Sequence, residues 1–159
     1  MKHFAKNKWV VILVGVLLGA NCSCGKTPEG YKEVYSAPTK PERLARFEKL
    51  PMQDQVNVYV YAVSHREPPD TTLVQAFVDQ RSEAVPAIVM RIELDDNERT
   101  KVLLLEALES ASLAGVKIGE ESVTINRLRS VSERIKDKDL QSRAQKSLQT
   151  IGRLAESSR

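Results

Sequence analysis

The stretch VPAIVMRIELDDNERTKVLLLEAL, residues 85–108, decides the fold of this 159-residue chain. Its apolar residues recur every three or four positions on both sides of an acidic turn, which is the spacing of amphipathic helices. Pro86 lies in the first turn of the first helix, where proline is tolerated. Asp95, with Glu98 three residues later, predicts the N-cap of the second helix. The stretch therefore predicts two helices joined by a tight turn.

The same period continues through residues 42–156. The segment QVNVYVYAVSH, residues 55–65, also alternates like a strand, but the sequence offers no second strand to pair with it, so we expect a helix. Gly115 is expected to end the helix that starts in the acidic turn. The predicted fold is all-α and consists of short antiparallel helix pairs, with further helices expected over residues 42–50, 73–77, 121–136 and 137–155. The last two are expected to face the core with their apolar stripes, namely Ile125, Leu128, Val131 and Ile135 on the first, and Leu140, Ala144, Leu148, Ile151 and Ala155 on the second.

Two of these segments are similar to each other and to a known repeat. VLLLEALESA (102–111) and RAQKSLQTIG (143–152) are similar when Leu108 is placed over Leu148, which puts residues 103–111 over 143–151. This offset of 40 residues falls in the period range of HEAT and armadillo arrays. The stretch DLQSRAQKSLQTIG, residues 139–152, resembles the second helix of a HEAT repeat, and the resemblance extends over residues 83–154. It implies an α-solenoid that serves as a protein-binding scaffold; a compact helical bundle is the alternative fold.

The N-terminal residues have the pattern of an export signal. Lys2, Lys6 and Lys8 precede an apolar run of twelve residues, 9–20, and no acidic residue occurs before Glu29. A membrane-spanning helix needs about 20 apolar residues, whereas the apolar region of a signal peptide has about 7–15. We therefore expect a signal peptide over residues 1–21.

The junction LLGANCSCGK, residues 17–26, resembles the processing site of bacterial lipoproteins, in which a lipidated cysteine becomes the mature N-terminus. The resemblance implies a lipid on Cys22, or alternatively on Cys24, although Asn21 stands where Gly, Ala or Ser is usual. Ser23 is similar to the residue that accompanies outer-membrane sorting. Ordinary cleavage, which would give a soluble periplasmic or secreted protein, is the other route. Residues 22–41, rich in Pro and Gly, are expected to form a flexible tether before a helical domain over 42–156.

Composition argues against several functions. The net charge is +3, but three of the 24 basic residues lie in the predicted signal, so 21 basic residues face 21 acidic ones in the remaining chain. Nucleic-acid binding requires a dense basic surface, so we expect no nucleic-acid partner. Aromatic residues make up 5% of the chain and the single Trp lies in the signal, which leaves few platforms for the sugars of a glycosidase substrate.

The candidate site residues are few. His65 is the one histidine beyond the predicted signal, and one histidine with no cysteine past Cys24 leads us to expect no catalytic residues, no metal site and no cofactor. Tyr59 and Tyr61 lie about 200° apart around a helix, so one is expected in the core and the other at the surface. With His65 one turn further on, Tyr59 and Tyr61 form the predicted partner-contact patch, because tyrosine is enriched in binding hot spots.

The sequence thus predicts an exported, lipid-anchored protein of the cell envelope whose non-catalytic helical domain binds another envelope protein. An immunity- or inhibitor-type protein is the alternative binding role, and an enzyme acting on the cell wall is the alternative class. The sequence leaves the partner and the oligomeric state open.

Overall fold

The computed structural model describes residues 26–65, 72–80, 83–118 and 121–157. Within these ranges the chain forms α-helices and no β-strand, which confirms the predicted all-α class. The segment 55–65, whose sequence also alternates like a strand, is helical, as predicted. The helices are α1 (Tyr31–Tyr35), α2 (Lys40–Glu48), α3 (Met52–His65), α4 (Val74–Asp79), α5 (Val85–Leu94), α6 (Glu98–Leu113), α7 (Glu121–Glu133) and α8 (Lys138–Ser157).

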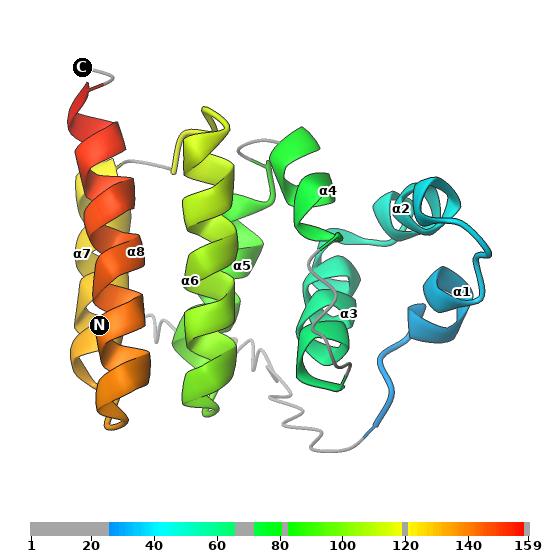
Figure 1. Cartoon of the computed structure of the whole chain (residues 1–159), viewed down its shortest axis with the longest axis horizontal. Coiled ribbons are helices and arrows are strands. Elements are labelled where there is room, and N and C mark those ends of the chain that lie inside the picture. The colour runs from blue at the N-terminus through cyan, green and yellow to red at the C-terminus, as the bar shows by residue number, and fades with distance from the viewer. Residues whose placement is uncertain (1–25, 66–71, 81–82, 119–120, 158–159) are drawn as a thin grey trace, which may run out of the picture.

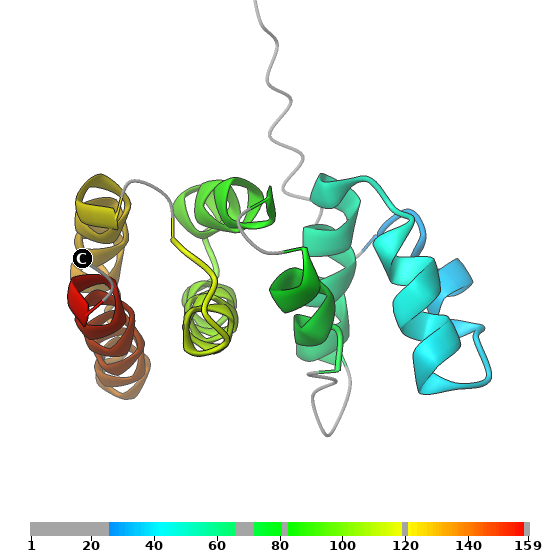
Figure 2. The same cartoon turned by 90° about the horizontal axis from the view of Figure 1, so that it is seen from above.

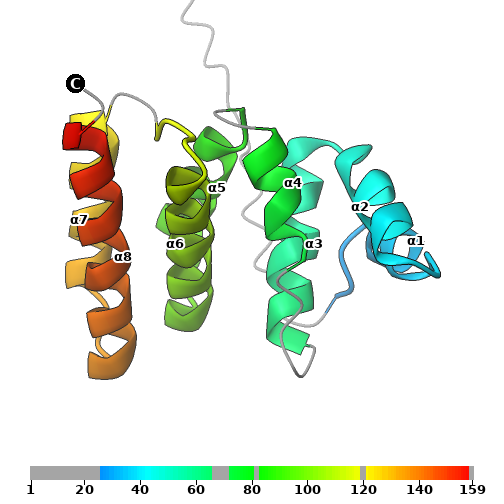
Figure 3. The ribbon, with the colours of Figure 1, turned by 45° about the horizontal axis from the view of Figure 1, so that its top comes forward.

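Consecutive helices pair, and the pairs stack in a row with α1–α2 at one end and α7–α8 at the other (Figure 1). α4 contacts α2 and α6, and α6 contacts α8, so these helices form one layer. α5 contacts α3 and α7 in the second layer. The view from above shows the two layers, and the oblique view shows the row of pairs (Figures 2 and 3). The arrangement gives the molecule two end faces and an elongated surface along each layer.

Polar side chains fix several helix ends. The Thr39 hydroxyl accepts a hydrogen bond from the Glu42 N–H, and Pro41 lies in the first turn of α2. α6 ends in a Schellman motif: the Val116 N–H donates to the Ala111 carbonyl, and Gly115 has a φ of 87°. The predicted role of Gly115 at the end of α6 is therefore confirmed.

The start of α6 differs from the predicted capping box. The N-cap is Asn97, whose side-chain oxygen accepts from the Thr100 N–H at 3.2 Å. Asp95 instead ends α5, where it pairs with Arg91 at 2.8 Å and accepts from the Asn97 N–H. Glu98 reaches the turn between α7 and α8 and not its own helix start. A prediction from local spacing could not include this partner, because it lies in the next helix pair.

A single apolar core runs through the row and unites the helix pairs. Between α2, α3 and α4 it contains three aromatic rings: Phe77 meets Phe47 edge-on at 5.7 Å and Tyr59 edge-on at 5.4 Å between centroids. Toward the C-terminus the core is aliphatic. In α7 and the turn after it, the apolar residues that recur at the helical spacing are all buried, namely Ile125, Leu128, Val131 and Ile135.

Neighbouring pairs are also joined by side chains at a regular sequence spacing. Arg91 of α5 donates to Asn57 of α3, and Arg127 of α7 donates to Glu93 of α5; both contacts span 34 residues. In the other layer, Arg143 of α8 binds Glu106 of α6 across 37 residues. In the layer of α3, α5 and α7, each residue of the first contact lies 36 positions before its counterpart in the second, whereas the sequence alignment of residues 102–111 and 143–152 gives an offset of 40. The repeated spacing of 34 residues shows that α5 packs on α3 and α7 packs on α5 in similar registers.

The structure departs from the expected flexible tether over residues 22–41. Residues 31–35 form α1, and Val34 is fully buried while Ala37 is 5% exposed. The guanidinium of Arg46 in α2 donates to the Glu33 carbonyl at 2.9 Å and to the Ser36 hydroxyl at 2.8 Å. A five-residue helix is too short to be stable alone or to show a period, so only its packing reveals it. In the described part of the chain, the folded domain therefore begins before residue 42.

Candidate functional site

The two candidate lipidation residues, Cys22 and Cys24, lie outside the described residues. Lipidation therefore stays a prediction from the sequence. Among the described residues, no helix is both long and apolar enough to cross a membrane.

Tyr59 belongs to the core and not to the predicted contact patch. Its side chain is 2% exposed and packs edge-on against Phe77. Burial raises the pKa of its phenol well above the ordinary value, and the nearby negative charge of Glu106 raises it further. In this fold, Tyr59 therefore neither ionises at neutral pH nor faces a partner. The expectation that one of the two tyrosines lies in the core is met by Tyr59, because it shares a helix face with buried Val56 and Val63.

Tyr61 and His65 do lie together at the surface. The two rings are stacked, with centroids 4.1 Å apart and planes 14° from parallel. His65 is exposed, Tyr61 is half-buried, and His65 Nδ1 lies 3.0 Å from the Tyr61 carbonyl oxygen. This i, i+4 hydrogen bond fixes the imidazole over the phenol at the C-terminal end of α3. Two of the three predicted contact residues are therefore adjacent and accessible.

Helix α1 extends this pair into a longer cluster. The Tyr31 ring meets Tyr61 edge-on at 4.6 Å, and Tyr35 lies 4.6 Å from Tyr31. We call His65, Tyr61, Tyr31 and Tyr35 the aromatic row. At its far end the guanidinium of Arg43 lies 4.8 Å above the Tyr35 ring, within cation–π range. The row thus runs from α3 to α1, and Arg43 of α2 lies at its end.

Sequence reasoning missed Tyr31, Tyr35 and Arg43 because they fell in or beside the expected tether. The signal that could have found them is the spacing of the two tyrosines, which are four residues apart and would share a face of any helix formed there. The contact between Tyr61 and Tyr31 depends on the tertiary structure, since 30 residues separate the two in the chain.

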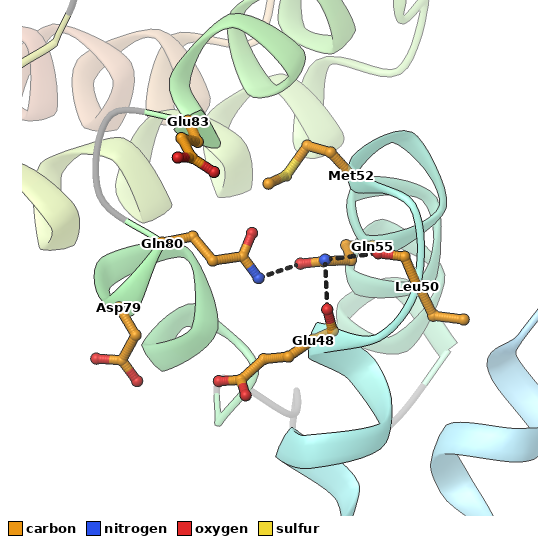
Figure 4. Close-up of a pocket in the computed structure, with 7 residues that line it drawn as sticks. All are labelled: Glu48, Leu50, Met52, Gln55, Asp79, Gln80 and Glu83. Atoms are coloured by element: carbon orange, nitrogen blue, oxygen red, sulfur yellow. Dashed lines mark hydrogen bonds between the residues drawn. The ribbon is translucent and has the colours of Figure 1, made fainter.

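An open pocket of about 550 Å³ lies on another part of the surface, where α2 and α4 end beside the start of α3 (Figure 4). The Gln55 amide forms its floor: Nε2 donates to the Leu50 carbonyl at 2.8 Å, and Oε1 accepts from Gln80 Nε2 at 2.8 Å. Figure 4 shows the remaining lining side chains around this floor, namely Glu48, Met52, Asp79 and Glu83.

The chemistry of this pocket favours cations. Three carboxylates line it, no basic side chain does, and the C-terminal ends of α2 and α4 add the negative ends of two helix dipoles. The described residues nevertheless bring together no group of three or more His, Cys, Asp or Glu side chains that could hold a metal ion. The pocket is therefore an acidic depression and not a metal cage.

The comparisons with known proteins found no relative of this chain. A scan against protein-family models, a search of curated proteins and a search of solved structures each gave no match to this chain. Functional conclusions therefore depend on the chain's own residues and geometry.

Proposed function

We propose that this protein is an exported lipoprotein of the cell envelope, anchored to the outer membrane through Cys22, and that its helical domain binds another envelope protein without catalysing a reaction. The aromatic row is the proposed contact surface. The N-terminal signal pattern supports export, and the helix row supports a scaffold role.

The observation that carries the binding role is the clustering of half-buried tyrosines with an exposed His65 at one end of the helix row. Tyrosine and arginine are enriched in protein interfaces. Tyrosine offers a large contact area and a polar tip at little conformational cost. The rings of the row already hold one another in place, so little side-chain entropy remains to be lost when a partner binds. Such preorganisation is a property of binding hot spots.

The stacked helix pairs support the proposed kinship with HEAT-like repeats. Contacts between α3 and α5 and between α5 and α7 recur at the same spacing of 34 residues. Arrays of this kind use their elongated surfaces to bind other proteins. This part of the proposal is an analogy at the level of the fold.

The contacts of His65 support a non-catalytic role for that residue. A catalytic histidine is normally oriented by a carboxylate and faces a nucleophile. Here the ring stacks on Tyr61, and the hydrogen bond from its Nδ1 side joins the backbone carbonyl of the same residue. The surroundings of His65 are those of a surface contact residue.

Site-specific photo-crosslinking in the native envelope tests the proposal. A photoreactive phenylalanine analogue at Tyr61 is expected to yield one discrete adduct, and the same analogue at exposed Gln149 of α8 is the matched control. Adding His65→Ala to the Tyr61 probe should reduce the adduct at unchanged protein level. No adduct at position 61, or equal adducts at 61 and 149, would contradict a contact surface on the aromatic row.

A further inference from the structure

We propose that α1 keeps the α1–α2 end of the helix row close to the membrane, so that the aromatic row lies near the lipid surface. The inference rests on the proposed lipidation of Cys22. The proposed tether ends at Gly30, so it is much shorter than the tether over residues 22–41 that the sequence composition predicts.

Three kinds of contact attach α1 to the rest of the domain. Val34 is fully buried in the common core, and the Tyr31 ring packs edge-on against Tyr61 of α3. Arg46 of α2 holds the C-terminal end of α1 through the Glu33 carbonyl and the Ser36 hydroxyl. Apolar burial, ring contact and hydrogen bonds thus act on the same five-residue helix. α1 is part of the folded domain.

The attachment extends back to Gly30. A Cβ atom on this residue would lie 2.7 Å from the Leu50 side chain, so the backbone here is in close contact with the end of α2. Gly30 also has a φ of 80°, which turns the chain into α1. From Gly30 onward the chain follows the domain surface and adds nothing to the free length of the tether.

The remaining free length is short. An extended chain spans at most about 3.6 Å per residue, so the eight residues from Cys22 to Gly30 reach about 29 Å. A tether ending at Pro41 would have nineteen residues and reach about 68 Å. An acyl chain on Cys22 therefore confines the α1–α2 end to a thin layer above the bilayer. The α7–α8 end, at the opposite end of the row, is free to lie further away (Figure 1).

This geometry also defines the partner. A protein that contacts the aromatic row must itself lie at the membrane surface, because the row includes α1 and moves with the anchored end. The proposed partner is accordingly a protein held at the surface of the same membrane leaflet.

Energy transfer in proteoliposomes tests the orientation. The full-length lipoprotein would carry Cys24→Ser and one labelled cysteine, either Ala45→Cys on α2 or Gln149→Cys on α8, both at exposed positions at opposite ends of the row. With acceptor-labelled lipid headgroups, we expect clearly higher transfer from position 45 than from position 149. Inserting twelve Gly/Ser residues between Lys26 and Thr27 lengthens the tether without touching α1, and it should remove most of that difference.

A second variant addresses the attachment itself. Tyr31→Ala combined with Val34→Ala should release α1 and lower transfer from position 45, with helix content from circular dichroism showing that the rest of the domain stays folded. Equal transfer from positions 45 and 149 in the wild type, or no effect of the insertion, would overturn the proposal. A protein that does not float with liposomes, and whose Cys22 carries no acyl mass, would instead refute the proposed lipidation.

Discussion

The ring of Tyr31 meets the ring of Tyr61 edge-on, with centroids 4.6 Å apart and planes at 69°. This contact joins α1, which composition assigns to a tether, to α3 in the body of the domain. It also completes the aromatic row, so one pair of rings contributes both to the position of the N-terminal segment and to the proposed contact surface.

Replacing Tyr31 tests the energetic weight of that contact. Tyr31→Ala removes ring contacts with Tyr61 and Tyr35, each worth about 0.5–1.5 kcal/mol beyond area burial, so we expect a loss of about 2 kcal/mol in the free energy of unfolding. Tyr31→Phe keeps the ring and should stay within about 0.5 kcal/mol of wild type. Urea unfolding of residues 22–159 measures both. Equal stability of the Ala and Phe variants would mean that the ring contacts contribute nothing.

Two glycines should respond to alanine with opposite signs. Gly30 has a φ of 80° and no room for a Cβ beside Leu50, so Gly30→Ala should lower the unfolding free energy by about 1–2 kcal/mol. Gly152 lies within α8 with open space around it, so Gly152→Ala should raise stability by about 0.8–1.0 kcal/mol. Denaturant unfolding of the two variants gives the comparison. Changes of the same sign would contradict the described conformation at Gly30.

Helix α7 offers a matched pair of apolar positions. Leu128 is fully buried, whereas Val123 on the same helix is 54% exposed. Leu128→Ala creates a cavity and should cost about 3 kcal/mol, while Val123→Ala removes little burial and should change stability by less than about 0.5 kcal/mol. Thermal or denaturant unfolding distinguishes them. Similar losses at both positions would mean that α7 packs with a different face inward.

Glu98 predicts a pH dependence of stability. Its carboxylate accepts hydrogen bonds from the backbone N–H groups of Lys136 and Asp137, and these bonds lower its pKa in the folded state. The unfolded chain therefore binds a proton at Glu98 more readily than the folded one does. The contribution is fully present above the unfolded pKa of glutamate and is lost as pH falls through the lower folded pKa.

The variant Glu98→Gln makes this dependence measurable. We expect wild type to be more stable than Glu98→Gln at neutral pH and the difference to shrink toward about pH 3, below the ordinary glutamate value. Glu156→Gln, at an exposed position of α8, is the control and should show little pH-dependent difference. A stability difference between wild type and Glu98→Gln that is constant across this range would exclude the linkage.

The sequence predicts the longer helices well because their apolar periodicity extends over several turns. The buried positions of α7 and the end of α6 at Gly115 follow from spacing and from the φ that glycine tolerates. The choice of helix for residues 55–65 succeeded through a tertiary argument, namely that the sequence offers no partner strand. Local signals were thus sufficient for those helices whose own residues carry the apolar period over several turns.

The same local signals failed at the start of α6, where two local patterns compete and one carboxylate binds another helix pair. Asp95 and Glu98 have the spacing of a capping box, yet Asp95 binds Arg91, and Glu98 binds the turn before α8. The role of Asp95 is local, since Arg91 lies four residues earlier on the same helix, but its spacing to Glu98 points to a capping box instead. The partners of Glu98 lie 38 and 39 residues away and are brought near only by packing. The same limit applied to Tyr61, whose neighbour His65 was predicted while its neighbour Tyr31 was not.

By itself, the sequence determined the all-α class, most of the helices and the inward faces of α7 and α8, since amphipathic periodicity encodes which side of a helix leaves water. Only the tertiary structure decided that Tyr59 is buried, that Tyr61 is accessible and that α1 is part of the domain. The physical reason is that α1, with five residues, cannot form on its own. It exists because Val34 and Tyr31 find apolar partners on α2 and α3, which no local pattern records.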